Sequence, residues 1–177
     1  MIVDATLDIT RKSGFDDANV RAIAGVLDCS TQPVMYQFKT AEEIREAAFK
    51  KASKSYIEYL LTPKKDDDSV NVALNYIKYA SEEKNMYKFL YQSKDLKGIG
   101  AFDIVEMPEF RNVINEISKE NKISEVKAKE VLIQQLIFAH GYADMIANDM
   151  LEFNKKDIKK DLKKQLKAAV YVAKKAE

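Results

Sequence analysis

Apolar residues recur every three or four positions along almost the entire chain. This spacing gathers them on one side of an α-helix, and no stretch alternates in the way that would predict a strand. We therefore predict an all-α fold of about nine helices. Their expected ranges are 2–13, 20–27, a helix that begins after Ser30, 41–61, 70–80, 85–93, 108–121, 124–151 and 155–175.

Residues that stop or start helices mark the ends of the first three. Gly14 can end the first helix, and the side-chain oxygen of Asn19 can cap the second. Asp28 and Cys29 leave room only for a tight turn, and aspartate tolerates the left-handed backbone conformation that a tight turn uses. Pro33 falls in the first turn of the third helix, where no intrahelical N–H bond is lost.

A polar segment separates two parts of the chain. The stretch "PKKDDDS" at 63–69 is charged and begins with proline, and it follows a long helix that opens with a capping box of Thr40 and Glu43. We predict an N-terminal domain over 1–50 and a larger helical domain over 51–177. Only five glycines and three prolines occur among 177 residues, so turns are few and helices are long.

Three short helices with a tight turn between the second and the third are typical of a helix-turn-helix. Such a unit buries the apolar residues of all three helices and leaves the start of the third helix projecting toward a DNA major groove. Ser30 can cap that helix, and glutamine is a natural bidentate partner for adenine. The predicted DNA-binding residues are Asn19, Arg21, Ser30, Thr31, Gln32, Pro33, Tyr36, Gln37 and Lys39.

These residues resemble the tetracycline-repressor (TetR) family of bacterial transcriptional regulators. The resemblance runs without gaps over about 2–50 and rests on Ala5, Gly14, Phe15, Val20, Ile23, Ala24, Ser30, Val34, Phe38, Glu42, Glu43 and Ile44. It implies a DNA-binding regulator, expected here to be a repressor, whose helical C-terminal domain binds a small molecule. It also implies a homodimer formed through the last two long helices. The stretch "FAHGYADMIA" resembles the His-Gly-containing helix of one C-terminal subgroup.

Tyrosine, phenylalanine and methionine are frequent in the middle of the chain. Methionine fills irregular spaces, and buried tyrosines need partners for their hydroxyls, so some of these side chains are candidates for a ligand cavity. No cluster of arginine or lysine interrupts them, and we expect an apolar or aromatic ligand. The predicted ligand-binding residues are Tyr76, Tyr79, Met86, Phe89, Phe102, Met107, Phe110, Phe138 and Tyr142.

The last two long helices carry the predicted dimer interface. A glycine in mid-helix costs near 1 kcal/mol relative to alanine, and close approach of a second helix would justify Gly141. His140 and Asp144 lie one turn apart, which favours a hydrogen bond in a core or interface over a metal site. The predicted dimerisation residues are Gly141, Met145, Leu162 and Leu166.

Other classes of protein find less support in the sequence. No glycine-rich phosphate loop, metal-ligand cluster or nucleophile–base pair occurs, so we expect no enzymatic activity, no cofactor and no metal. We find neither a long apolar run nor a signal-peptide pattern, and we expect a cytoplasmic protein without a membrane partner. Cys29, the single cysteine, allows no internal disulfide and is expected to pack in the small N-terminal core.

A helical protein–protein adaptor that keeps the fold without binding DNA is the alternative. Ala41 stands where the TetR family carries a lysine that contacts phosphate. Residues 1–54 hold eight basic and eight acidic side chains, so this part of the chain has no net charge to attract phosphate. The whole chain has a formal net charge of +1.

Overall fold

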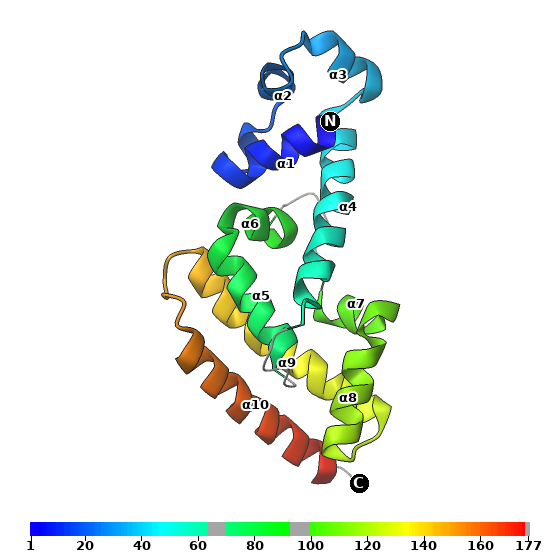
Figure 1. Cartoon of the computed structure of the whole chain (residues 1–177), viewed down its shortest axis with the longest axis vertical. Helices are drawn as coiled ribbons and strands as arrows, with labels where there is room; N and C mark the ends of the chain where they lie inside the picture. Colours follow the sequence, from blue (N-terminus) through cyan, green and yellow to red (C-terminus); the bar gives the residue numbers. More distant parts are fainter. Residues whose placement is uncertain (64–69, 93–99, 176–177) are drawn as a thin grey trace. The chain divides into compact units, whose positions relative to one another are not determined.

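The computed structural model describes residues 1–63, 70–92 and 100–175. Helices account for most of them and no strand occurs among them, which confirms the predicted all-α class (Figure 1). The α-helices are α1 (Ile2–Ser13), α2 (Val20–Val26), α3 (Thr31–Gln37), α4 (Ala41–Leu60), α5 (Asn71–Glu82), α6 (Lys84–Gln92), α7 (Ala101–Glu106), α8 (Arg111–Asn121), α9 (Glu125–Ala147) and α10 (Lys155–Lys175). Two 3-10 helices, η1 (Phe15–Asp17) and η2 (Pro108–Phe110), complete the described elements.

Most of the predicted helix ends are confirmed. Gly14 follows α1 with a φ of 97°, and Asp28 has a φ of 49° in the turn between α2 and α3. The Oδ1 atom of Asn19 accepts from two backbone N–H groups of α2, each at 3.1 Å. Ser30 does precede α3, but its side chain makes no capping hydrogen bond, so that part of the prediction is wrong.

One helix lies outside the predicted set. α7 begins after Gly100, whose backbone N–H donates to the Asp103 side chain at 3.0 Å. This short-range bond supports a helix of only six residues, too short for its apolar spacing to be recognised. The predicted polar boundary at 63–69 lies, apart from Pro63, outside the described residues, as does the end of the helix expected over 85–93.

The chain forms two compact units. The first contains residues 1–58 and 83–98, and the second contains 59–82 and 99–177. The division therefore falls near the end of α4, and α6 belongs with the N-terminal helices although α5 precedes it in the sequence. The predicted division at residue 50 placed residues 83–98 in the C-terminal domain, whereas they belong to the first unit.

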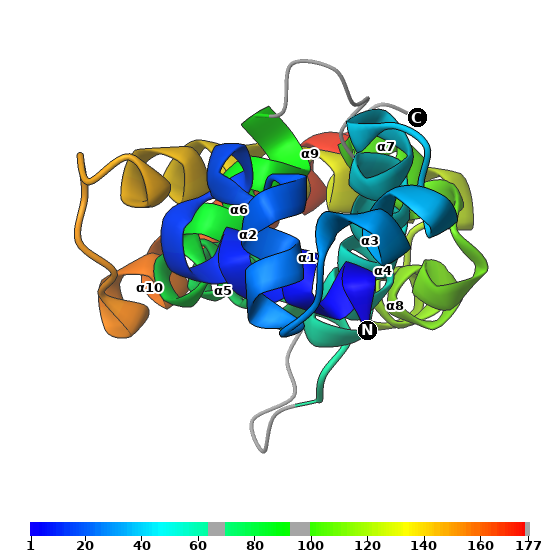
Figure 2. The ribbon, with the colours of Figure 1, turned by 90° about the horizontal axis from the view of Figure 1, so that it is seen from above.

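The three N-terminal helices enclose a small apolar core in the first unit. Its buried members are Ile2, Ala5, Ile23, Ala24, Val34 and Ile44, with Ile9, Val20, Leu27 and Phe38 packed against them. α2 contacts both α1 and α3 (Figure 2). Phe15 of η1 stacks on Phe89 of α6 with ring centroids 4.7 Å apart, and the Arg45 guanidinium lies 4.5 Å above the Phe15 ring.

α9 is the central helix of the second unit. α5, α7, α8 and α10 all pack against it, and α10 also contacts α5. Its buried side includes Leu132 and Leu136, and Ile77 of α5 and Leu162 of α10 are also buried. A hydrogen bond supports the same packing, because the hydroxyl oxygen of Tyr76 in α5 lies 2.9 Å from Nδ1 of His140 in α9. Among the described helices, none is both long and apolar enough to cross a membrane.

Candidate functional site

A tight turn sets the direction of α3 relative to α2. The N–H of Leu27 donates to the carbonyl of Ile23 at 3.1 Å, and the N–H of Cys29 donates to the carbonyl of Ala24 at 3.0 Å. With Asp28 in the left-handed conformation, these bonds end α2 and redirect the chain within three residues. α2 and α3 are thus two short helices joined by a tight turn.

α3 packs against the small N-terminal core through one side only. Val34 is completely buried in the small core and Phe38 is half-buried, while the remaining residues of α3 face outward. All nine predicted DNA-binding residues are exposed, and Tyr36 keeps 91% of its surface accessible. The structure therefore places a polar, projecting helix start where the sequence predicted one.

The outward side of α3 combines hydrogen-bonding groups with an aromatic ring. Gln32 and Tyr36 are four residues apart and share one face of the helix, as do Thr31 and Met35. Pro33 occupies the first turn and donates no N–H there, so it does not interrupt the helix. Glutamine and threonine side chains are groups that read base edges, and tyrosine can donate to phosphate.

The charge around this surface is mixed. Within the described part of the chain, the side chains of Arg21 and Lys39 take part in no ion pair, so both cations can meet an external anion. Acidic groups lie nearby in the sequence, and the Glu43 carboxylate accepts from the backbone N–H of Lys39 at 2.8 Å. The surface can contact phosphate at a few points but has no extended basic patch.

The expectation that Cys29 packs in the small core is wrong. Its side chain is exposed, because the turn directs it away from the apolar residues of α2 and α3. The core is complete without it, since Leu27 and Val34 close that side.

The predicted ligand-binding residues do not form one cluster. Met86 and Phe89 belong to the first unit, whereas the other seven belong to the second. Within the second unit, Tyr76, Tyr79 and Phe110 are buried in the core, and Phe102 is 67% exposed. Phe138 and Tyr142 form an edge-on ring pair on α9 at 5.5 Å, and Met107 is half-buried. Aromatic content alone did not distinguish core from surface.

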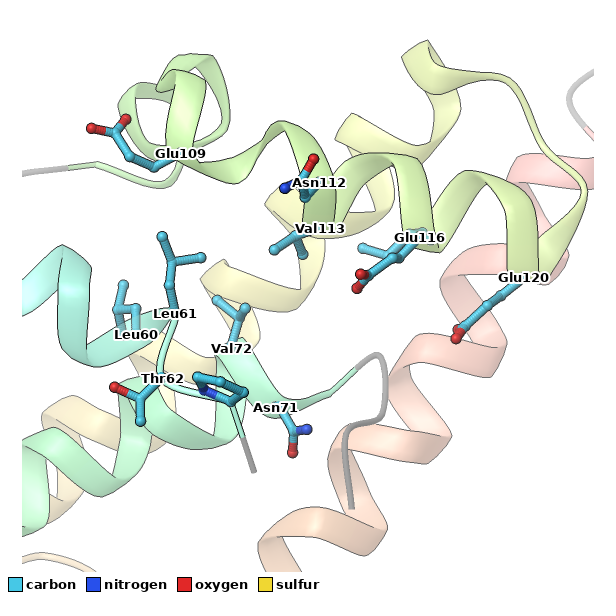
Figure 3. A pocket seen from close by; sticks show the side chains of 12 residues that line it. Leu60, Leu61, Thr62, Asn71, Val72, Glu109, Asn112, Val113, Glu116 and Glu120 are labelled. Atoms are coloured by element: carbon cyan, nitrogen blue, oxygen red, sulfur yellow. The ribbon is translucent and has the colours of Figure 1, made fainter. Parts of the chain in front are cut away.

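A groove in the second unit runs beside α8 (Figure 3). Its volume is about 510 Å³, and none of the nine predicted ligand-binding residues lines it. The lining comes from the end of α4, the start of α5, η2 and one face of α8. The twelve lining residues are Leu60, Leu61, Thr62, Pro63, Asn71, Val72, Glu109, Asn112, Val113, Glu116, Ile117 and Glu120.

The α8 side of the groove had a recognisable sequence signal. In α8, residues 112, 116 and 120 recur at a spacing of four, as do 113 and 117, so they share one helix face, whereas Glu109 lies in η2. Aromatic residues do not indicate this face, because none of its residues is aromatic. The α4 and α5 side had no signal, because residues 60–63 and 71–72 meet α8 only through the tertiary fold.

The predicted dimerisation residues fall into two pairs. Gly141 and Met145 are exposed on α9, and a Cβ built on Gly141 would have no neighbour within 4 Å. Leu162 and Leu166 are buried within the subunit, where α10 packs on α9 and α5, so they offer no surface to a second chain. The exposed side of α9 also carries large apolar side chains that the prediction omitted, Ile137 and Phe138.

A hydrogen bond between Tyr142 and Asp161 joins α9 to α10 at 3.0 Å. The bond from Tyr142, together with one from Lys164, lowers the pKa of the Asp161 carboxyl. Burial is the main cause that raises the pKa of the Tyr142 hydroxyl, and its bond to the Asp161 carboxylate adds to the effect. No group of three or more histidine, cysteine, aspartate or glutamate residues in the described ranges is arranged to hold a metal ion.

Comparisons of the chain with protein-family models, curated proteins and solved structures found no match. Functional conclusions therefore rest on the residues and geometry described above.

Proposed function

We propose that this protein is a TetR-like DNA-binding transcriptional regulator that acts as a homodimer and responds to a small molecule. One observation supports this function most strongly. Ten apolar residues hold three short helices together, and every predicted DNA-contacting residue at the start of α3 and around it is exposed. A helix that only completed a helical hairpin would have no reason to project a polar tip in this way.

In the proposed complex, α3 enters a DNA major groove. Gln32 and Thr31 reach base edges, whereas Arg21, Tyr36 and Lys39 contact phosphates. A single recognition helix reads only one half-site, so a dimer with two such helices is needed for a specific operator. The exposed apolar side of α9, with Ile137, Phe138, Gly141 and Met145, is the proposed dimer surface.

The proposed response to a ligand follows from linkage. A small molecule lowers DNA affinity only to the extent that it binds the DNA-free state more tightly than the DNA-bound state. The second unit holds the candidate ligand groove, and the last residues of α4 line it. We propose that the regulator is a repressor whose DNA binding is relieved when this groove is occupied.

The test begins by selecting bound sequences from a random library of double-stranded DNA with the purified full chain. The double variant Thr31→Ala, Gln32→Ala is then compared with wild type on the selected sequence and on random DNA. Loss of base contacts worth about 1–3 kcal/mol each should weaken binding to the selected sequence by roughly tenfold or more. Circular dichroism should not change, since both side chains are exposed.

Two lysine variants serve as a matched pair in the same assay. Lys39→Ala should weaken binding to all sequences alike and reduce the salt dependence, as expected for a phosphate contact. Lys54→Ala, at an exposed position in α4, should have little effect. Equal discrimination between selected and random DNA in wild type and the double variant would contradict the assignment of α3.

A protein–protein adaptor is the second candidate, and one observation favours it. Three large apolar or aromatic side chains of α2 and α3 are exposed, namely Val26, Met35 and Tyr36. Such a surface suits a protein partner, and the first 54 residues carry no net charge. The absence of any DNA retention at about 50 mM salt, where phosphate contacts are strongest, would favour the adaptor.

A further inference from the structure

Six of the twelve residues that line the groove beside α8 are apolar. Figure 3 shows Leu60 at the end of α4, Leu61 just after it, Val72 on α5 and Val113 on α8. Ile117 of α8 and Pro63 are the other apolar lining residues. The groove volume of about 510 Å³ falls within the range of roughly 300–1,000 Å³ that is usual for sites of small organic molecules. The apolar lining residues favour a ligand with a hydrophobic body over a small hydrated ion.

Charge on the same groove selects the kind of ligand. Three carboxylates line it, from Glu109 in η2 and from Glu116 and Glu120 in α8, and among the residues that the structure describes no lysine or arginine lines it. None of the three takes part in an ion pair or hydrogen bond within the described part of the chain. Figure 3 shows Glu116 and Glu120 on α8, across from Val72 and Asn71 of α5.

We propose that this groove binds a lipophilic organic cation. The apolar body of such a molecule packs against the apolar lining side chains and removes the partly exposed Leu61 and Val113 from water. Its positive charge lies beside the carboxylates, which would otherwise be left near an apolar ligand with no compensating charge. This inference rests on the proposed function, because it names the chemical class of the ligand to which the regulator responds.

The other classes of ligand fit the groove less well. An anion would be repelled by three glutamates and would find no cationic side chain among the lining residues. A neutral apolar molecule would contact the walls but would gain nothing from the carboxylates. A hydrophilic cation would be attracted by charge alone, and attraction between hydrated, exposed groups is weak.

The test uses a pair of ions of the same shape and opposite charge. Isothermal titration calorimetry of the full chain with tetraphenylphosphonium should show binding, whereas tetraphenylborate in sodium buffer should not bind. Raising the salt concentration from about 50 to about 500 mM should weaken phosphonium binding, because salt screens exposed charges. Spermidine should bind much more weakly than the phosphonium, because it lacks an apolar body.

A charge-removing variant then locates the site. The triple variant Glu109→Gln, Glu116→Gln, Glu120→Gln keeps the shape of the groove and removes its charge. Each exposed carboxylate contributes modestly to binding of the cation, so removing all three charges should lower phosphonium affinity about fivefold or more. The matched control changes three exposed glutamates that do not line the groove, Glu46→Gln, Glu130→Gln and Glu152→Gln, and it should retain wild-type affinity.

The outcomes separate this inference from the proposed function. Equal binding of phosphonium and borate, or unchanged binding in the groove variant, overturns the inference and leaves DNA retention as a separate result. Phosphonium binding that the groove variant weakens, in a protein that retains no DNA, supports the groove and overturns the regulator. Release of selected DNA by phosphonium in wild type, but not in the groove variant, supports both.

Discussion

At the scale of single residues, two buried amides of the second unit have contrasting surroundings. Asn75 donates from Nδ2 to the backbone carbonyls of Leu60 at 3.0 Å and Thr62 at 3.1 Å, at and just after the end of α4, whereas its buried Oδ1 has no partner among the described residues. Gln135 in α9 is completely buried, and neither of its amide atoms has a protein hydrogen-bond partner. The contrast therefore lies in the NH2 group: that of Asn75 satisfies two backbone carbonyls, whereas that of Gln135 carries the cost of its desolvation.

Replacing these two amides by apolar side chains of similar size should therefore have opposite effects. Asn75→Leu leaves buried carbonyls at the end of α4 without a donor and should lower the free energy of unfolding by about 1–3 kcal/mol. Gln135→Met removes an unsatisfied amide and should raise it by roughly 1 kcal/mol. Urea unfolding followed by circular dichroism measures both, and a larger loss in Gln135→Met than in Asn75→Leu would contradict the assignment.

Local chemistry explains why some residues could be predicted and others could not. The cap made by Asn19 depends on the next two N–H groups, so the sequence was sufficient to predict it. Cys29 is adjacent to the same turn, yet its exposure depends on how α1, α2 and α3 close their core. A small apolar residue in a turn can be buried in the core or exposed to solvent, and only the packing of the helices decides which.

At the scale of elements, the bond between Tyr142 and Asp161 ties α9 to α10 with a defined pH dependence. The pKa of Asp161 is lowered from its ordinary value of 3.8, so its contribution to stability is present above pH 3.8 and is lost as the pH falls. The pKa of Tyr142 is raised from 10.0, so its contribution is present below pH 10.0 and is lost as the pH rises further.

The variant Tyr142→Phe removes the shared hydrogen bond and should be less stable than wild type at neutral pH. The difference in melting temperature should shrink below pH 3.8, where Asp161 protonates in the unfolded chain. A carboxyl titration by NMR should show the Asp161 pKa moving up toward its ordinary value. Thermal scans from acid to neutral pH provide the stability measurement.

Tyr171→Phe is the matched control for this pair. Tyr171 is exposed on α10, and its ring lies under the Lys175 ammonium at 4.6 Å instead of bonding to a carboxylate. Loss of the Tyr171 hydroxyl should change neither the stability of the protein nor the pH dependence of that stability. A constant difference between Tyr142→Phe and wild type across the whole pH range would exclude the proposed coupling.

At the scale of the whole molecule, the exposed side of α9 bears on the proposed dimer. Gly141 has open space around it within its own chain, and Ile137, Phe138 and Met145 are exposed on the same helix. Nothing within the subunit requires a glycine there, and glycine weakens a helix by about 1 kcal/mol relative to alanine. In the proposed dimer, a second α9 packed against this position would supply the reason, because small residues let helices approach closely.

Gly141→Leu should accordingly leave the subunit folded and weaken the dimer. A Cβ at position 141 has no neighbour within 4 Å in its own chain, whereas overpacking of an interface costs about 1–3 kcal/mol. The dimer dissociation constant should rise by roughly tenfold or more, measured by sedimentation at several protein concentrations.

Gly141→Ala is the control for helix propensity in this experiment. It should raise the melting temperature, because alanine favours the helix by about 1 kcal/mol, and it should shift the association equilibrium less than Gly141→Leu does. Wild-type protein that is monomeric at micromolar concentration would contradict the dimer, and the paired recognition helices with it.

The sequence by itself determined the features that depend on neighbours along the chain. Helical spacing, the cap at Asn19, the glycine stop at Gly14 and the turn at Asp28 were all predicted, because each involves residues no more than a few positions apart. The projecting start of α3 followed from the same local patterns. These are the interactions that set secondary structure in any surrounding fold.

Only the tertiary structure decided which side chains meet across long stretches of chain. It grouped residues 83–98 with the first unit, buried Tyr76 and Phe110, exposed Cys29 and Phe102, and brought residues 60–63 and 71–72 beside α8. An apolar side chain has the same pattern in the sequence whether it faces a core, a groove or solvent. Its place depends on the packing of all helices together, which no local spacing contains.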